Sequence, residues 1–91
     1  MTIKQSVLNT LDRVGINYKK FEAETGEVEV SNRFGGGSCT TTPLVAELIE
    51  WVYRTNDAID AGRSNVKIDD FDRVRYFIAE TDPTAYSTCI D

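Results

Sequence analysis

The chain has 91 residues, of which 41% are hydrophobic and 27% are charged, and its formal net charge is −5 at pH 7. This length predicts one small domain with a thin core and modest stability. Histidine is absent, which excludes Ser-His-Asp and Cys-His catalysis and removes the commonest transition-metal ligand. The composition therefore predicts a protein that is not an enzyme and that binds no metal or cofactor.

The first element is expected to be a helix over residues 2–14. Its apolar residues recur at helical spacing and form one stripe: Ile3, Val7, Leu8, Leu11 and Val14. Thr2 can act as the N-cap, with Gln5 reaching back to it in a capping box. Gly15 supplies the left-handed residue that ends the helix, and Ile16 is placed to fold back onto the stripe.

A β-hairpin is expected over residues 17–31, with its turn at Gly26. Its second strand alternates between polar and apolar residues, which is typical of a strand with one buried face. Its first strand is less regular, because Tyr18 and Phe21 share a face only if a bulge lies between them. Two strands alone are marginally stable, so this hairpin should pack on helices.

A glycine- and threonine-rich loop is expected over residues 32–42, followed by a helix over residues 43–61. Three consecutive glycines make an ordered conformation entropically costly, and a simple connector does not require them. Thr42 and Pro43 fit the N-cap and the first position of the helix. The apolar face of this helix is wide, so it should contact the hairpin and another helix, or a second copy of the chain in a homodimer.

A further helix is expected over residues 69–80, with acidic residues in its first turn that complement the helix dipole. Asp82 precedes Pro83, and the residue before a proline resists helical geometry, so the helix should end there. The tail, residues 81–91, shows no periodicity and is expected to be irregular. Together these elements predict a single α+β domain over residues 1–91, in the order α-β-β-α-α.

Two cysteines, Cys39 and Cys89, lie far apart in the sequence and belong to no CxxC or metal-like grouping. The first residues show no apolar run typical of a signal peptide, and no segment approaches the roughly 20 apolar residues needed to cross a bilayer. These features favour a cytoplasmic protein without membrane association, in which both cysteines are free thiols. A disulfide between them stays open, because one lies in a loop and the other near the C-terminus.

The leading functional hypothesis is a small acidic, non-catalytic interaction protein, an inhibitor or adaptor of a protein partner. Residues 43–91 carry ten acidic and five basic side chains, whereas residues 1–42 are balanced. An acidic chain without a basic stripe is not expected to bind a nucleic-acid backbone, and a basic protein is the more natural partner. The candidate partner-binding residues are Phe34, Tyr53, Asp57, Asp60, Asp72 and Tyr76.

The alternative hypothesis is a small-ligand binder that holds an anion or a nucleotide phosphate with the Gly35–Thr42 loop and the helix N-terminus behind it. The candidate ligand-binding residues are Arg33, Gly35, Gly36, Gly37, Ser38, Thr40, Thr41 and Thr42. The loop lacks the lysine of a Walker A motif, and Pro43 removes one backbone donor. The same segment is also compatible with a plain connector that ends in a threonine cap.

Overall fold

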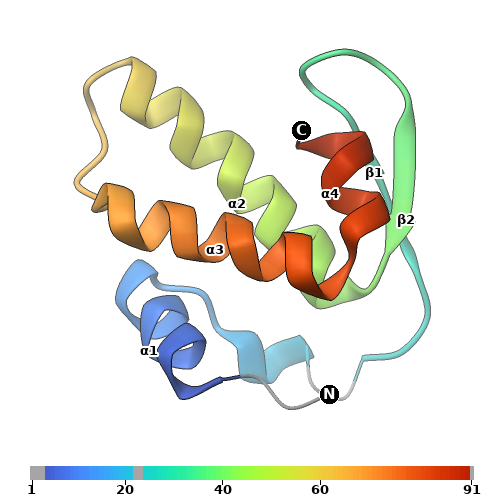
Figure 1. Cartoon of the computed structure of the whole chain (residues 1–91), viewed down its shortest axis with the longest axis horizontal. Coiled ribbons are helices and arrows are strands. Elements are labelled where there is room, and N and C mark those ends of the chain that lie inside the picture. The colour runs from blue at the N-terminus through green and yellow to red at the C-terminus, as the bar shows by residue number, and fades with distance from the viewer. Residues whose placement is uncertain (1–3, 22–23, 91) are drawn as a thin grey trace.

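The computed structural model of the chain describes residues 4–21 and 24–90. Its elements are α1 (Gln5–Val14), the 3-10 helix η1 (Tyr18–Phe21), β1 (Val28–Ser31), β2 (Ser38–Thr41), α2 (Pro43–Asp60), α3 (Ile68–Thr81) and α4 (Pro83–Cys89). The predicted α+β class and the order α-β-β-α-α are confirmed, with η1 and α4 as additions. Figure 1 shows α2 and α3 in the middle of the molecule, with α1 beneath α3 and with α4 beside the hairpin.

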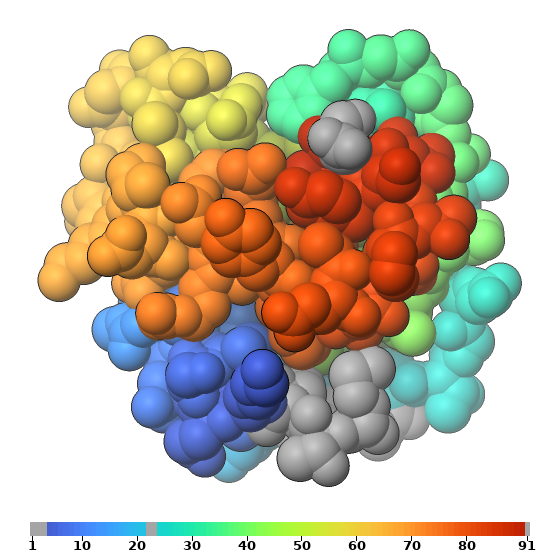
Figure 2. Space-filling model, in the orientation of Figure 1, coloured from blue at the N-terminus to red at the C-terminus, as the bar shows by residue number. Residues whose placement is uncertain are grey.

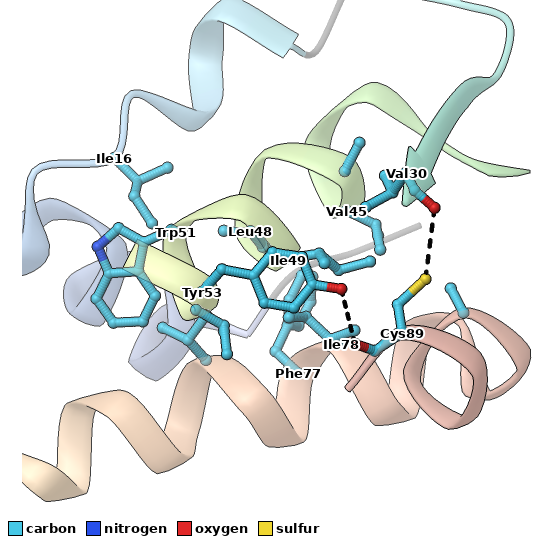
Figure 3. Packing of buried hydrophobic residues seen from close by; sticks show 14 of the residues in the cluster. Ile16, Val30, Val45, Leu48, Ile49, Trp51, Tyr53, Phe77, Ile78 and Cys89 are labelled. Atoms are coloured by element: carbon cyan, nitrogen blue, oxygen red, sulfur yellow. Dashed lines mark hydrogen bonds between the residues drawn. The ribbon is translucent and has the colours of Figure 1, made fainter. Parts of the chain in front are cut away.

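Helix α2 is the centre of the core, as its apolar face predicts. The hydroxyl of Thr42 accepts a hydrogen bond from the N–H of Val45 at 3.3 Å and thereby caps the helix. Leu48 and Ile49 are fully buried, and α2 contacts α3, both strands and η1 (Figure 3). The face that suggested a homodimer is therefore covered by the chain itself. Within the described residues, no helix is both long enough and apolar enough to cross a membrane.

Helix α1 packs on α3 and ends as predicted. Gly15 has φ 86°, its N–H donates to the carbonyl of Asp12, and the N–H of Ile16 donates to that of Leu11 at 2.9 Å. The helix begins at Gln5 rather than at residue 2, and the predicted cap lies outside the described residues. The side-chain amide of Gln5 donates to Asn9 on the next turn.

The hairpin lies further along the chain than residues 17–31, so that prediction is wrong. Strand β1 pairs with β2 in antiparallel register, from Val28 opposite Thr41 to Ser31 opposite Ser38. The turn is formed by the glycine-rich segment, in which Gly36 and Gly37 have φ of 96° and 83°. Two successive left-handed positions are cheap only for glycine, which explains why the segment reverses the chain.

The predicted loop over residues 32–42 is thus part turn and part strand. The N–H of Asn32 donates to the carbonyl of Gly37 at 3.0 Å and closes the hairpin. Beyond the turn, the threonines of β2 are β-branched, and such residues suit a pleated surface. Their side chains contribute to a strand in a segment predicted to be a loop.

The segment predicted as the first strand is instead η1. In a 3-10 helix residues i and i+3 lie on the same side. Tyr18 and Phe21 are therefore both half-buried, while Lys19 and Lys20 between them are exposed. The irregular spacing that would have required a bulge in a strand is the natural spacing of this helix.

The tail is not irregular, because residues 83–89 form α4. The carboxylate of Asp82 accepts from the N–H of Ala85 at 3.1 Å, and Pro83 occupies the first helical position. The pair Asp82-Pro83 therefore ends α3 at Thr81, as predicted, and also begins another helix. Ala85 and Cys89, four residues apart, are both buried on the inner face of α4.

A salt bridge joins α1 to α3. Arg13 donates to both carboxylate oxygens of Asp70, at 2.7 Å from Nη2 and 3.3 Å from Nε. The side chain of Asp70 is only 11% exposed. The hydrogen bond from the Arg13 guanidinium, outweighing the opposing effect of burial, lowers the pKa of Asp70 below its ordinary value.

We expect acid to remove the contribution of Asp70 to stability. Because the pKa of Asp70 is lower in the folded state, this contribution is present above the unfolded-state pKa of about 3.9 and is lost as the pH falls through the folded-state pKa. Asp70→Asn should therefore be less stable than the wild type at neutral pH, and the difference should shrink in acid. Urea denaturation across the pH range measures it, with Asp69→Asn as the exposed control. A difference that stays constant with pH would show that the ion pair is not its source.

Candidate functional site

The residues predicted to hold an anion lie at opposite ends of β2. Gly35–Gly37 form the hairpin turn, whereas Thr42 caps α2. The side-chain oxygen of Asn32 accepts from the N–H of Phe34 at 2.7 Å and from that of the next residue at 3.2 Å. The backbone donors of the turn and the start of the helix therefore do not converge on one ligand.

The remaining predicted ligand residues do not gather either. Ser38 and Thr40 are exposed in β2. Thr41 is buried, and its hydroxyl donates to the carboxylate of Asp82 at 2.7 Å. This places a negative charge close to the start of α2, where an anion would have to bind. Arg33 lies at the hairpin turn, apart from that helix start.

Three of the predicted partner-binding residues meet at the hairpin tip. The ring of Phe34 is 56% exposed and makes an edge-on contact with Tyr53, at 5.1 Å between centroids and 88° between planes. The guanidinium of Arg33 lies 5.5 Å from the Tyr53 ring and 3.8 Å from Asp57. Tyr53 itself is buried, and its ring packs against the hairpin tip. Phe34 is therefore the exposed aromatic residue of the tip.

Two more of those residues lie on the outer face of α3, which crosses the front of the molecule in Figure 2. Tyr76 is 66% exposed and lies one turn after Asp72. A shallow cavity of about 240 Å³ lies beside them. Arg73 also lines it, and Asp72 is 3.7 Å from Arg75. Charges of both signs thus alternate here, and this face does not select the charge of a partner. Asp60 is exposed at the end of α2.

A cleft that the sequence reading missed lies between β1, η1 and the first half of α2, with a volume of about 240 Å³. Its apolar lining consists of Phe21, Val28, Val30, Pro43 and Ala46. Its acidic lining consists of Glu24, Glu29, Glu47 and Glu50. Among the residues that the structure describes, no lysine or arginine lines it. We call this feature the glutamate cleft.

The acidic side chains of the glutamate cleft are mostly uncompensated. Glu47 lies 3.3 Å from Arg54, which stands outside the cleft lining. Within residues 4–21 and 24–90, Glu24, Glu29 and Glu50 form no ion pair. Val28 is 41% exposed beside them. The cleft therefore combines an accessible apolar surface with a negative rim.

The glutamate cleft also contains a free strand edge. In an antiparallel pair the residues alternate between those that bond to the partner strand and those that face away. The bond from Asn32 to Gly37 sets this alternation, so the backbone groups of Glu29 and Ser31 point away from β2. In the described part of the chain the sheet has two strands. Among residues 4–21 and 24–90 the outer edge of β1 thus has no partner strand, and β1 residues line the cleft.

A third cavity, of about 310 Å³, lies on the other side of η1. Lys20 and Arg54 line it together with Glu47, so its charged lining is of mixed sign. Across the described residues, no group of three or more cysteine and acidic side chains is placed to hold a metal ion. Among the three cavities described above, the charged lining of the glutamate cleft has a single sign, whereas the other two linings carry both signs. A scan against protein-family models, a search of curated proteins and a search of solved structures each gave no match.

Proposed function

We propose that the protein is a non-catalytic binding module that takes an extended basic segment of a partner protein into the glutamate cleft. The observation that supports this most is the coincidence of four glutamates with the unpaired edge of β1. A module of this kind acts by occupying its partner, as an inhibitor or an adaptor does. The absence of histidine from the chain agrees with a role that needs no general base at neutral pH.

The binding mode follows from the edge of β1. An extended peptide can add to a sheet edge as a further strand, with main-chain hydrogen bonds providing affinity and alternate side chains providing specificity. Here the backbone groups of Glu29 and Ser31 would pair with the incoming strand. Lysine and arginine have apolar stems, which would lie on the lining around Val28, and charged ends, which would reach the carboxylates.

The same features disfavour pairing between two copies of this chain. Strand β1 has four residues, and a short, charged edge discourages self-association. Two copies paired at this edge would bring the glutamates of both clefts together, and like charges opposite each other are destabilising. The cleft therefore selects a basic strand against an acidic one.

We expect a synthetic peptide of alternating lysine and valine to bind the protein, and Glu29→Gln/Glu50→Gln to weaken this binding roughly fivefold, because two exposed ion pairs are lost. Asp60→Asn/Asp72→Asn is the matched control, since it also removes two negative charges but leaves the cleft intact. Isothermal titration measures the affinity, and amide chemical shifts should change at Glu29 and Ser31.

Three results would count against the proposal. Equal weakening in both double variants would show that the peptide responds only to net charge. Equal binding of an alternating glutamate and valine peptide would show that charge is not selected. Chemical-shift changes confined to α3 or to the hairpin tip would place the peptide elsewhere on the surface.

A further inference from the structure

The two cysteines of the chain meet in the fold. The Sγ atoms of Cys39 and Cys89 lie 2.7 Å apart, although the residues are 50 positions apart in the sequence. Two carbon atoms in contact are about 3.5–4.0 Å apart, and sulfur is larger than carbon. The separation is therefore closer to a disulfide bond, about 2.05 Å, than to a contact between non-bonded atoms.

Other contacts hold the two cysteines in place. The hydroxyl of Tyr53 donates to the carbonyl of Cys89 at 2.7 Å (Figure 3). The side-chain amide of Asn32 donates to the carbonyl of Thr88 at 2.7 Å, which ties α4 to the hairpin. The Sγ of Cys89 also lies 3.7 Å from the carbonyl oxygen of Val30. These contacts anchor the end of α4 beside the hairpin and hold the two sulfurs near each other.

We propose that Cys39 and Cys89 are a site of reversible oxidation, at which a disulfide bond ties α4 covalently to β2. The oxidant we assign is a small-molecule disulfide, of the class of oxidised glutathione. This inference is independent of the glutamate cleft, because neither cysteine lines it.

The reaction proceeds by two exchanges. The thiolate of Cys39 attacks one sulfur of the small disulfide, forms a mixed disulfide and releases one small thiol. The thiolate of Cys89 then attacks the Cys39 sulfur, forms the internal bond and releases the second small thiol. The two cysteines together lose two electrons and two protons. These electrons and protons reduce the small disulfide to two small thiols. Cys39 is the entry point because it is only partly buried, whereas Cys89 is fully buried.

The environment makes the first exchange slow at neutral pH. Burial, followed by the neighbouring Cys89 and then Asp82, raises the pKa of Cys39 to about 12. Only the thiolate is nucleophilic, so oxidation should accelerate as the pH rises toward this value. The tyrosine that faces the pair, Tyr53, keeps its phenolic proton over most of that range, because its pKa is also raised to about 12.

The test uses the purified full chain in buffers of reduced and oxidised glutathione. After equilibration, free thiols are trapped with an alkylating reagent and counted by mass spectrometry, and a digest without reductant identifies any linked peptides. We expect both thiols to disappear together in oxidising buffer and a peptide pair containing Cys39 and Cys89 to appear. The melting temperature of the wild type should rise by roughly 10 °C or more on oxidation, because the bond closes a long loop.

The control moves one thiol to the other face of the strand. Successive residues of a strand point to opposite faces, so Ser38→Cys/Cys39→Ser retains two cysteines but turns one sulfur away from α4. This variant should form no internal disulfide and should not gain stability on oxidation. The proposal is overturned if the wild type keeps both thiols in oxidising buffer, if it forms only mixed or intermolecular disulfides, or if the control forms the internal bond equally well.

Discussion

Leu48→Ala is expected to lower the free energy of unfolding by about 3 kcal/mol. Leu48 is fully buried in α2, the helix that contacts α3, both strands and η1. Removing its side chain loses apolar burial and leaves a cavity. The surrounding helices and strands pack against one another and cannot move in to fill it. A domain of this size has a total stability of roughly 5–10 kcal/mol, so the loss is a large share of it.

Urea denaturation followed by circular dichroism measures this loss. Leu44→Ala provides the control, because Leu44 lies one turn earlier in the same helix and is only partly buried. It should lose about 1 kcal/mol, since less apolar surface returns to water. If Leu48→Ala were no more damaging than Leu44→Ala, α2 would not be the centre of the core.

The two long helices were predictable because their signals are local and agree with one another. The helix expected over 43–61 is observed as Pro43–Asp60, and the one expected over 69–80 as Ile68–Thr81. In the first, apolar periodicity and the Thr42 cap point to the same segment. Agreement between periodicity and capping leaves few alternative structures for such a sequence.

The predicted position of the hairpin is wrong because its turn was assigned to the wrong glycine. The prediction placed the turn at Gly26 and assigned Gly35–Gly37 to a loop that follows the hairpin. In the structure Gly26 also has positive φ, but it precedes β1 and reverses no hairpin. What distinguishes the real turn is Asn32, whose side chain accepts from two N–H groups of the turn and donates to Thr88. The last of these bonds depends on α4, which local sequence cannot place.

Helix α4 was missed because seven residues are too few to show a period. Its start carries the same signal as α2, an N-cap residue followed by proline, and that signal was used only as a stop. An isolated helix of this length is unstable in water, so its stability comes from tertiary contacts. The hydroxyl of Tyr53 and the amide of Asn32 supply two of them.

The glutamate cleft could not be predicted, because its rim is assembled from separate elements. Glu29 belongs to β1, and Glu47 and Glu50 belong to α2. The charge balance of residues 1–42 concealed the contribution of Glu24 and Glu29, since the basic residues that offset them in the sum do not line the cleft among the described residues. The position of Tyr53 was also predicted wrongly. The sequence assigned it to the surface, but it is buried in the fold, where its hydroxyl contacts α4.

Tyr53 joins three parts of the molecule, and this makes it the other position at which a large effect is expected. Its ring lies on α2, in contact with Phe34 of the hairpin tip, and its hydroxyl bonds to Cys89 of α4. Burial, followed by the influence of Cys89, raises its pKa to about 12. The phenol is thus held in its neutral form, in which it can donate a hydrogen bond.

Tyr53→Ala should lower the free energy of unfolding by about 4 kcal/mol, because a buried aromatic side chain leaves a large cavity. Tyr53→Phe should cost only about 1 kcal/mol, since it keeps the ring and removes one hydrogen bond. The two variants separate packing from polar anchoring. Hydrogen exchange should show faster exchange of the α4 amides in Tyr53→Phe, with the amides of α1 unchanged. Uniform acceleration in both helices would mean that the hydroxyl contributes to the whole fold and not to the docking of α4.

Alkaline pH gives an independent check on the Tyr53 hydroxyl. Because the pKa of Tyr53 is higher in the folded state, its contribution is fully present below the unfolded-state pKa of about 10 and is lost as the pH rises toward about 12. The stability difference between the wild type and Tyr53→Phe should therefore shrink over this range. A difference that persisted at the alkaline end would mean that the ring environment, and not the hydrogen bond to Cys89, accounts for the effect of Tyr53→Phe.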